Sequence, residues 1–408
     1  MGSEPWGALV GPTWAEVDLD AVVANLALVR SVLREGCRLL AVVKANAYGH
    51  GAVEIARTVL AVGADAVGVG TVAEGLRLRS AGIDGTILVF TPPRPVDIGP
   101  ALDADLSLTV ASLEDALALA RSRPVGGRVH LKLDTGMGRY GLPWREVGSL
   151  VPRLMELGFP LQWDGIYTHF ARGADRAAAG QELARLLQAE EVARSAGMSF
   201  AMRHSAASAA VLTLPEAHLD MVRVGSLLYG HMPLGVHTNL PFRKAFTLCS
   251  TVAEVRPVPK GEEVGYGGEW RARRPTVIAT LPVGFADGLD IVMGGPLRRP
   301  GVLFRALVGS LARRVGLGRF LRLGAAASAV VLDGRVVQTV GRVGMQHVTV
   351  DCTGVPTVRA GIVAQLRVPS TVVGAHLPRV FVQGGRPVRA DTPLGTALPC
   401  GQGVEEEA

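Results

Sequence analysis

The stretch LLAVVKANAYGHG, residues 39–51, carries the pattern from which the fold can be worked out. It opens with a short apolar run, ends that run at Lys44, and continues into a turn that contains two glycines. The next segment, AVEIARTVLAVG (52–63), places apolar residues three and four positions apart, which predicts an amphipathic helix. The whole stretch is therefore typical of a β-strand that leads through a loop into a helix.

This strand–helix unit recurs along the first 240 residues. Segments rich in Ala, Leu and Arg, with helical spacing, lie between eight short β-rich runs. These runs are LLAVVK (39–44), AVGVG (66–70), TILVF (86–90), LSLTV (106–110), RVHLKLD (128–134), DGIYTHF (164–170), FAMRHS (200–205) and MVRVGSLLYG (221–230). Eight such units over roughly 200–250 residues predict an α/β fold, with an N-terminal (β/α)8 TIM-like barrel. A doubly wound open sheet is the alternative.

The pattern changes after Pro241. Four later runs are rich in Val and Thr, are punctuated by Gly, and mostly lack helical segments between them. They are TLCSTVAEVRPV (247–258), TVIATLPVGFADG (276–288), SAVVLDGRVVQTVGRVG (328–344) and QHVTVDCTG (346–354). We predict a barrel over residues 1–242, a C-terminal mostly-β domain over 243–390 and a tail over 391–408.

Composition limits the class of protein. The chain has 408 residues, of which 48% are hydrophobic and 19% charged, so a large core is expected and global disorder is excluded. Four scattered cysteines show no CxxC spacing, which argues against a disulfide scaffold or a structural zinc site. No apolar run is long enough to span a membrane, and the first residues do not resemble a signal peptide. We therefore expect a cytoplasmic protein without a bound metal.

The positive charge is concentrated in one insertion, at about residues 296–323. This insertion holds seven arginines and no acid, and removing them from the net charge of +6 leaves about −1. Basicity confined to one segment, with only 5% aromatic residues, argues against nucleic-acid binding. Leu303, Leu307, Leu311 and Val315 recur every four residues, which predicts a basic amphipathic helix. The helix could be a lid or cover its own domain, or it could dock an acidic protein partner or an anionic membrane surface.

Reactive side chains in such a barrel are expected at the carboxyl ends of the strands. The candidates there are Lys44, Asp134, Arg139, His169, His204, Ser205, Arg223 and Gly225. An apolar strand leading into Lys44 favours a nucleophilic amine over a surface lysine, and glycine after the last strand suits an anion. Together these features suggest pyridoxal phosphate. The arginines could instead form buried salt bridges, and the histidines could be structural.

Six motifs, in this order along the chain, resemble those of the alanine racemase family. They are AVVKANAYGHG (41–51), HLKLDTGMGRYGL (130–142), RVGSLLYG (223–230), EVGYGG (263–268), PVGFADG (282–288) and VGRVGMQ (340–346). The resemblance covers roughly residues 14–385. It implies pyridoxal phosphate as cofactor, a homodimer with shared active sites, and interconversion of L- and D-alanine or of a somewhat larger neutral amino acid.

The resemblance implies catalytic roles for five residues. Lys44 would hold the cofactor as a Schiff base and act as base on one face of the substrate Cα. Tyr266 from the other subunit would act on the opposite face, because inversion needs two bases that flank a planar carbon. Arg223 would face the pyridine nitrogen, and His169 would link Arg223 to Tyr266. Arg139 would reach the phenolic oxygen of the cofactor.

Further implied contacts hold the phosphate and the substrate. The phosphate would be bound by hydroxyl and backbone N–H groups of Tyr48, Ser208, Gly225 and Ser226. The Met345 backbone N–H, together with Arg139, would meet the substrate carboxylate. Lys132, at a position often carbamylated in the family, would lie beside Arg139.

Four positions depart from the family pattern. Phe285 replaces a tyrosine, Gln346 an aspartate and Ala207 an asparagine, while Leu366 replaces a tyrosine that touches the phosphate and narrows the substrate entrance. Each change enlarges or depolarises the site, which leaves room for a substrate somewhat larger than alanine, unless the changes are neutral and compensated nearby. Two alternatives remain: another Cα reaction, such as epimerisation, aldol-type cleavage or decarboxylation, and a non-catalytic protein that binds pyridoxal phosphate.

Overall fold

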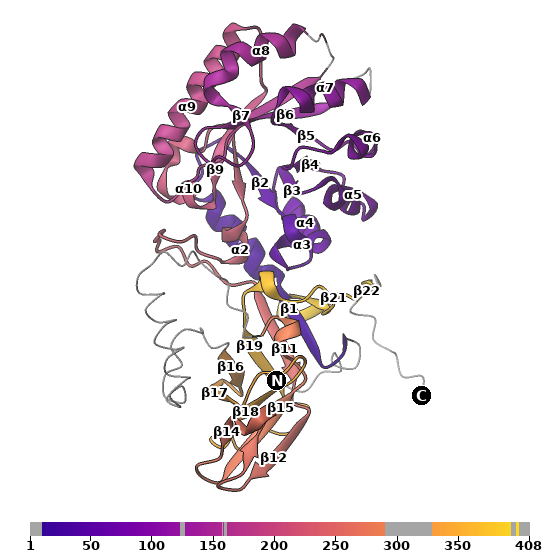
Figure 1. Ribbon diagram of the computed structural model, residues 1–408, viewed down its shortest axis with the longest axis vertical. Helices are drawn as coiled ribbons and strands as arrows, with labels where there is room; N and C mark the ends of the chain where they lie inside the picture. Colours follow the sequence, from indigo (N-terminus) through magenta and orange to yellow (C-terminus); the bar gives the residue numbers. More distant parts are fainter. Residues whose placement is uncertain are drawn as a thin grey trace. The chain divides into compact units, whose positions relative to one another are not determined.

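The computed structural model describes residues 10–122, 127–156, 158, 161–289, 329–392 and 397–399 (Figure 1). These residues form two compact units. One comprises Asp18–Ala245 with Val382–Gly385, and the other comprises Phe246–Phe381 with the described residues before Asp18 and after Gly385. The arginine-rich insertion at 296–323 lies outside the described residues, and so do its expected amphipathic helix and partners.

The first unit is a barrel of eight parallel strands. They are β2 (Arg38–Val42), β3 (Ala66–Val69), β4 (Thr86–Val89), β5 (Leu108–Val110), β6 (Arg128–Asp134), β8 (Gln162–Tyr167), β9 (Met202–Ala207) and β10 (Met221–Val224). Hydrogen bonds connect them in the order β4-β3-β2-β10-β9-β8-β6-β5, and a bridge between Leu88 and Ser107 joins β4 to β5. This closure confirms the predicted barrel and excludes the open sheet.

Helices follow the strands, as the alternating pattern predicts (Figure 1). They are α2 (Leu19–Arg30), α3 (Lys44–Tyr48), α4 (Ala52–Ala61), α5 (Val72–Ser80), α6 (Pro95–Asp103), α7 (Leu113–Ser122), α8 (Val147–Glu156), α9 (Arg176–Ser195) and α10 (Ser208–Thr213). Helix α4 buries Ile55, Ala56 and Val59, the stripe that its spacing predicts. Strand β2 is buried from Leu39 to Val42, which is typical of a parallel strand covered on both faces.

The second unit is built on one large sheet. Its strands, in hydrogen-bonded order, are β12 (Glu254–Val258), β15 (Thr276–Leu281), β18 (Val348–Asp351), β17 (Arg335–Val340), β16 (Ala329–Leu332), β19 (Val363–Arg367), β11 (Phe246–Thr251), β1 (Thr13–Asp18), β20 (Arg379–Gln383), β21 (Arg386–Asp391) and β22 (Ala397–Pro399). A two-stranded ribbon of β13 (Glu263–Val264) and β14 (Trp270–Arg271) is separate. The expectation of a mostly-β domain is thereby confirmed.

Two segments differ from the domain limits that we predicted. Strand β1 pairs antiparallel with β11, Thr13 opposite Ser250, so residues 13–17 belong to the β unit rather than to the barrel. Residues 397–399, which we assigned to a tail, form β22 and pair with β21. The β1–β11 pairing joins segments far apart in the chain, so local periodicity could not predict it.

Candidate active site

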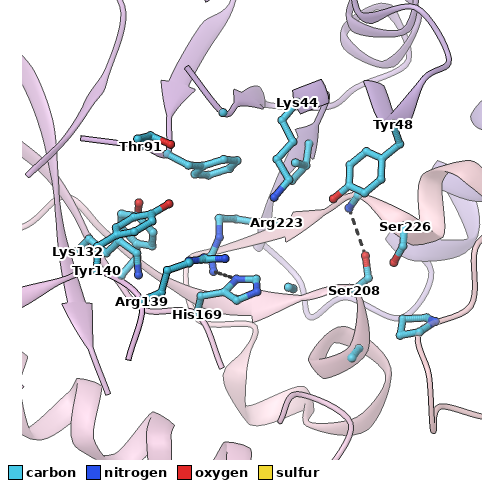
Figure 2. A pocket seen from close by; sticks show the side chains of 18 residues that line it. Lys44, Tyr48, Thr91, Lys132, Arg139, Tyr140, His169, Ser208, Arg223 and Ser226 are labelled. Atoms are coloured by element: carbon cyan, nitrogen blue, oxygen red, sulfur yellow. Dashed lines mark hydrogen bonds between the residues drawn. The ribbon is translucent and has the colours of Figure 1, made fainter. Parts of the chain in front are cut away.

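A cavity of about 340 Å³ lies at the carboxyl ends of the barrel strands. It brings together ten residues singled out in the sequence: Lys44, Tyr48, Lys132, Arg139, His169, Ala207, Ser208, Arg223, Gly225 and Ser226. The lining residues that sequence reasoning missed are Val42, Gly70, Phe90, Thr91, Tyr140, Tyr167, Ala209 and Pro233. Figure 2 shows the Lys44 amine, the Tyr48 hydroxyl and the Arg223 guanidinium around one space.

The cavity is strongly cationic. Two lysines and two arginines line it, and no carboxylate is among its lining residues in the described part of the chain. Lys132 is only 3% exposed, and burial beside Arg223 and Arg139 lowers its pKa to about 8. Its amine lies 5.0 Å from the centre of the Tyr140 ring, so an aromatic face rather than an acid faces the charge. Such a cavity is suited to a ligand with several negative groups.

Lys44 opens an unusual turn. Ala45, Asn46, Ala47 and Tyr48 all have φ between 51° and 55°, which makes helix α3 a left-handed turn. Each non-glycine residue in this conformation costs roughly 1–2 kcal/mol. Hydrogen bonds hold the turn, among them Ala52 N–H to the Asn46 Oδ1 at 2.9 Å. The turn places the amine of Lys44 and the hydroxyl of Tyr48 in one cavity (Figure 2).

The environment of Lys44 shifts its amine towards the neutral form. Burial lowers the pKa of its amine, and the positive charges of Arg139 and Arg223 lower it further. A neutral amine is the nucleophilic form of lysine, so the expected reactivity of Lys44 agrees with its surroundings.

Arg139 is delivered by a turn that the carboxylate of Asp134 organises. Asp134 Oδ1 accepts hydrogen bonds from the N–H groups of Gly136 at 2.9 Å and Met137 at 3.0 Å. The glycines of TGMGR allow the chain to wrap around one carboxylate, and Gly138 has φ 67°. Asp134 itself therefore shapes the loop and does not line the cavity.

Arg223 is buried and held by several acceptors. It donates to His204 Nδ1 at 2.9 Å, to the Thr168 carbonyl at 2.7 Å and to the Ser205 carbonyl at 3.1 Å. A longer contact of 3.4 Å reaches His169 Nδ1 (Figure 2). Burial lowers the pKa of Arg223 to about 10, so the guanidinium stays charged at neutral pH. The side chain can therefore only donate to a group in the cavity.

A chain of histidines lies behind Arg223. Because the guanidinium can only donate, His204 accepts at Nδ1, and burial holds the His204 pKa well below its ordinary value. A neutral His204 therefore carries its proton on Nε2 and donates it to His130 Nδ1, 2.9 Å away. Of the two roles open to His204 from the sequence, reactive or structural, its complete burial between Arg223 and His130 supports the structural one.

His130 is a residue that sequence reasoning missed. Burial lowers its pKa to about 3, so it is also neutral. A signal was available, because His130 and Lys132 are two positions apart on β6 and point to the same face of the strand. Gly165 on the neighbouring strand makes room for the ring, since a Cβ there would lie 2.3 Å from His130 Nδ1.

His169 stands at the mouth of the barrel beside Arg223. Burial and the surrounding cations, Arg223 first, lower its pKa to about 3, so its ring is neutral at physiological pH. It can therefore pass hydrogen bonds between neighbours without adding charge.

The opposite end of the cavity fits a phosphate. Ser208 Oγ accepts from the Gly225 N–H at 3.2 Å (Figure 2), and the Tyr48 and Ser226 side chains lie beside them. A Cβ at Gly225 would lie 2.6 Å from the Tyr48 hydroxyl, so glycine is what lets this hydroxyl come so close to the backbone. Burial raises the pKa of Tyr48, which keeps its hydroxyl protonated as a donor. Hydroxyl and N–H donors around a space that a Cβ would fill are the groups a phosphate needs.

Tyr266 and Met345 belong to the β unit, whereas every residue that lines the cavity belongs to the barrel. Tyr266 opens the short turn η4 (Tyr266–Gly268) and is 74% exposed, and Met345 is 63% exposed. Hydrogen bonds from Phe285 N–H to the Gly344 carbonyl and from Ala286 N–H to the Met345 carbonyl, both 3.0 Å, join the loop of Met345 to the turn that begins at Phe285. These two predicted site residues therefore stand exposed on their own unit.

The four departures from the family pattern lie in different surroundings. Ala207 lines the cavity, while Phe285 and Gln346 are exposed on the β unit. Leu366 is buried in the apolar core of the large sheet, where it packs with Leu248 and Val330. A packing role for Leu366 follows, and its expected effect on substrate size stays a prediction.

Lys132→Met is expected to stabilise the chain without added cofactor at neutral pH, because methionine keeps the length of the side chain and removes the amine. The pKa of Lys132 falls from 10.5 to about 8 on folding, so its charged form destabilises the fold below pH 8 and the penalty disappears as pH rises towards 10.5. We expect a gain on the order of 2 kcal/mol at pH 7 that vanishes near pH 10.5. Urea unfolding at several pH values measures it. Lys244→Met, at an exposed position, is the control, and a gain that does not change with pH would contradict the assignment.

A closed barrel whose cavity combines a buried lysine, further cationic side chains and a group of hydroxyl and N–H donors is suited to an enzyme that acts with an anionic ligand. Comparison with known proteins agrees with this class. The family model described as alanine racemase, N-terminal domain, matches residues 17–233, and that described as alanine racemase, C-terminal domain, matches residues 245–310. The alanine racemase of Desulfosudis oleivorans is 36% identical over 363 residues, which cover 85% of each chain.

Solved structures give the same result. The alanine racemase of Clostridium difficile 630 superposes with a TM-score of 0.80 and 27% identity, over 93% of this chain and 98% of that one. The alanine racemase of Bacillus anthracis, solved with bound L-Ala-P, gives a TM-score of 0.78 and 28% identity, over 94% and 98%. The chain belongs to the alanine racemase family, which confirms the resemblance stated above and makes it an enzyme of the isomerase class.

No helix among the described residues is both long and apolar enough to cross a membrane. Nor does that part of the chain bring together three or more His, Cys, Asp or Glu side chains that could hold a metal ion.

Proposed function

We propose that the protein is a pyridoxal-phosphate-dependent amino-acid racemase that interconverts L- and D-alanine, or a somewhat larger neutral amino acid. One observation carries the proposal: the Lys44 amine, with its lowered pKa, opens into a cavity lined by four cationic side chains and no described carboxylate. The family membership of the chain supports it.

The residues present fit the cofactor. Lys44 would bind its aldehyde carbon, Arg223 would donate to its ring nitrogen, and Arg139 would donate to its phenolic oxygen. The phosphate would be held by Tyr48, Ser208, Gly225 and Ser226. When bound, pyridoxal phosphate supplies an electron sink that acidifies the Cα–H bond of the amino acid.

The side chains of the protein then move the proton. Lys44 Nζ exchanges a proton with one face of Cα, and Tyr266 Oη exchanges one with the other face. Arg223 keeps its own proton and leaves the ring nitrogen unprotonated, which limits electron withdrawal and discourages transamination. Arg139 and the Met345 N–H would orient the substrate carboxylate.

A homodimer with shared sites would supply Tyr266 from a second copy. Tyr266 and Met345 are both highly exposed on the β unit, which suits residues that complete a site on a partner.

Lys132, with a pKa of about 8, is partly neutral near physiological pH, and the neutral amine is the form that carbamylation needs. The buried free thiols of Cys37, Cys249 and Cys352 suit the cytoplasmic location that we expect.

Incubation with single L-amino acids in heavy water tests the proposed function. We expect L-alanine, or a somewhat larger neutral amino acid, to yield both enantiomers with deuterium at Cα. Chiral separation followed by mass measurement reads out enantiomer and label together. Exchange without inversion, or loss of carbon dioxide, would contradict racemisation and would favour another Cα reaction.

A further inference from the structure

Glu74, on helix α5, is a carboxylate that the proposed chemistry does not use. It is the third residue of α5 and forms a capping box with Thr71: the Glu74 N–H donates to Thr71 Oγ1 at 3.3 Å, and the Thr71 N–H donates to Glu74 Oε2 at 3.2 Å. A capping box needs no further contact. The side chain nevertheless accepts two more hydrogen bonds from outside the helix.

Those two bonds reach the turn that carries Lys44 and the loop beside it. The Ala45 N–H donates to Glu74 Oε1 at 2.7 Å, and the Gly70 N–H donates to Glu74 Oε2 at 2.6 Å. Ala45 is the first left-handed residue after Lys44, with φ 51°. The carboxylate therefore fixes the backbone at the point where the strained turn begins.

The position of Glu74 also matters for charge. A Cβ placed on Gly70 would lie 3.0 Å from Glu74 Oε2 and 3.6 Å from the Lys44 Cβ, so the carboxylate and the base of the lysine side chain flank one glycine. The charged groups that act on the Lys44 amine are Arg139 on the loop after β6, Arg223 on β10 and Glu74 on α5, and the neutral His169 also faces it. Of these, Glu74 alone favours the protonated amine.

We infer that Glu74 is a positioning residue for the active-site lysine: it anchors the left-handed turn through Ala45 and supplies the negative charge that offsets Arg139 and Arg223 at Lys44. The inference rests on the proposed role of Lys44 as the residue that binds the cofactor. A purely structural cap would stabilise α5 and leave the lysine unaffected. The two roles therefore differ in what they do to the titration of Lys44.

Glu74→Gln tests the inference in the full chain loaded with pyridoxal phosphate. The visible absorbance of the bound cofactor, followed against pH, reports protonation of the nitrogen that Lys44 contributes. Removing the charge is expected to move the midpoint to lower pH by roughly half a unit to one unit. Loss of the charged acceptor at Ala45 is expected to weaken cofactor retention about tenfold, measured by equilibrium dialysis.

Two control variants separate this role from helix capping. Thr71→Ala removes the hydroxyl of the capping box and leaves the Glu74 contact with Ala45. Asp115→Asn alters a similar cap at the start of α7, where Asp115 Oδ2 accepts a hydrogen bond of 2.9 Å from the Ala111 N–H. Asp115 does not line the cavity. Both are expected to lower Tm and to leave the titration and cofactor retention unchanged.

The outcomes are distinct. An unshifted titration in Glu74→Gln, with a Tm loss equal to that of Thr71→Ala, would show a cap only and overturn the inference. If Glu74→Gln does not fold, Glu74→Asp decides through cofactor retention, since aspartate keeps the charge but is one methylene too short for the Ala45 N–H. Weaker retention with a nearly unchanged titration is then expected, and unchanged retention overturns the inference. Wild-type chain that binds no cofactor would instead refute the proposed function.

Discussion

Lys44→Ala is expected to abolish racemisation, with a loss of more than about 10³-fold, because both the covalent link to the cofactor and the base on one face of Cα disappear. Borohydride reduction of the wild-type chain is expected to fix the cofactor on Lys44. In the variant no cofactor should be fixed. Peptide mass measurement is unambiguous here, since the sequence contains only four lysines: Lys44, Lys132, Lys244 and Lys260.

Lys260→Ala serves as the matched control, because this lysine is exposed on the β unit. The Lys260→Ala chain should keep the borohydride-fixed cofactor on Lys44 and should racemise like the wild type. Trapping at Lys132 in place of Lys44 would refute the assignment, since Lys132 is the other lysine that lines the cavity.

Tyr266→Phe is expected to impair racemisation by roughly 10²–10⁴-fold, because it removes one of two proton-transfer groups and keeps the ring. Deuterium exchange from one enantiomer should suffer far more than exchange from the other, since Lys44 still serves its own face. Progress curves started separately from the L- and D-enantiomer in heavy water measure the asymmetry. Cofactor trapping at Lys44 should be unaffected, which separates loss of proton transfer from loss of cofactor.

Mixing two inactive variants tests where Tyr266 acts. In a hybrid dimer of Lys44→Ala and Tyr266→Phe chains, shared sites would give one site with both wild-type residues and one with neither. Random reassociation is therefore expected to restore about a quarter of wild-type activity. If both residues of a site came from one chain, every site in the mixture would lack one of them. No recovery in verified hybrid dimers would refute the shared site.

Much of the barrel and its site could be predicted because their signals are local. Strand and helix periods differ, so the alternation up to Pro241 is visible in short windows, and strand ends mark where Lys44, His169 and Arg223 converge. The motif resemblance added Tyr48 and Ser208, which the cavity also contains.

What could not be predicted depends on contacts between distant residues. Nothing in Ala-Asn-Ala-Tyr demands φ near +55°, and the turn at residues 45–48 exists because groups elsewhere, such as Glu74, hold its backbone. Strand β1 reaches its place only by pairing with residues more than 200 positions away. Contacts between distant segments decide the structure in both cases.

The excess of positive charge in the cavity has a consequence for the lifetime of the protein. Two arginines and two buried lysines lie close together, so positive charge in the cavity is costly, and a dianionic ligand that binds only the folded chain offsets this cost. Binding of this kind stabilises the native state in proportion to the logarithm of ligand concentration. The supply of pyridoxal phosphate in a cell would then govern how much of the enzyme escapes proteolysis, as well as how much of it is active.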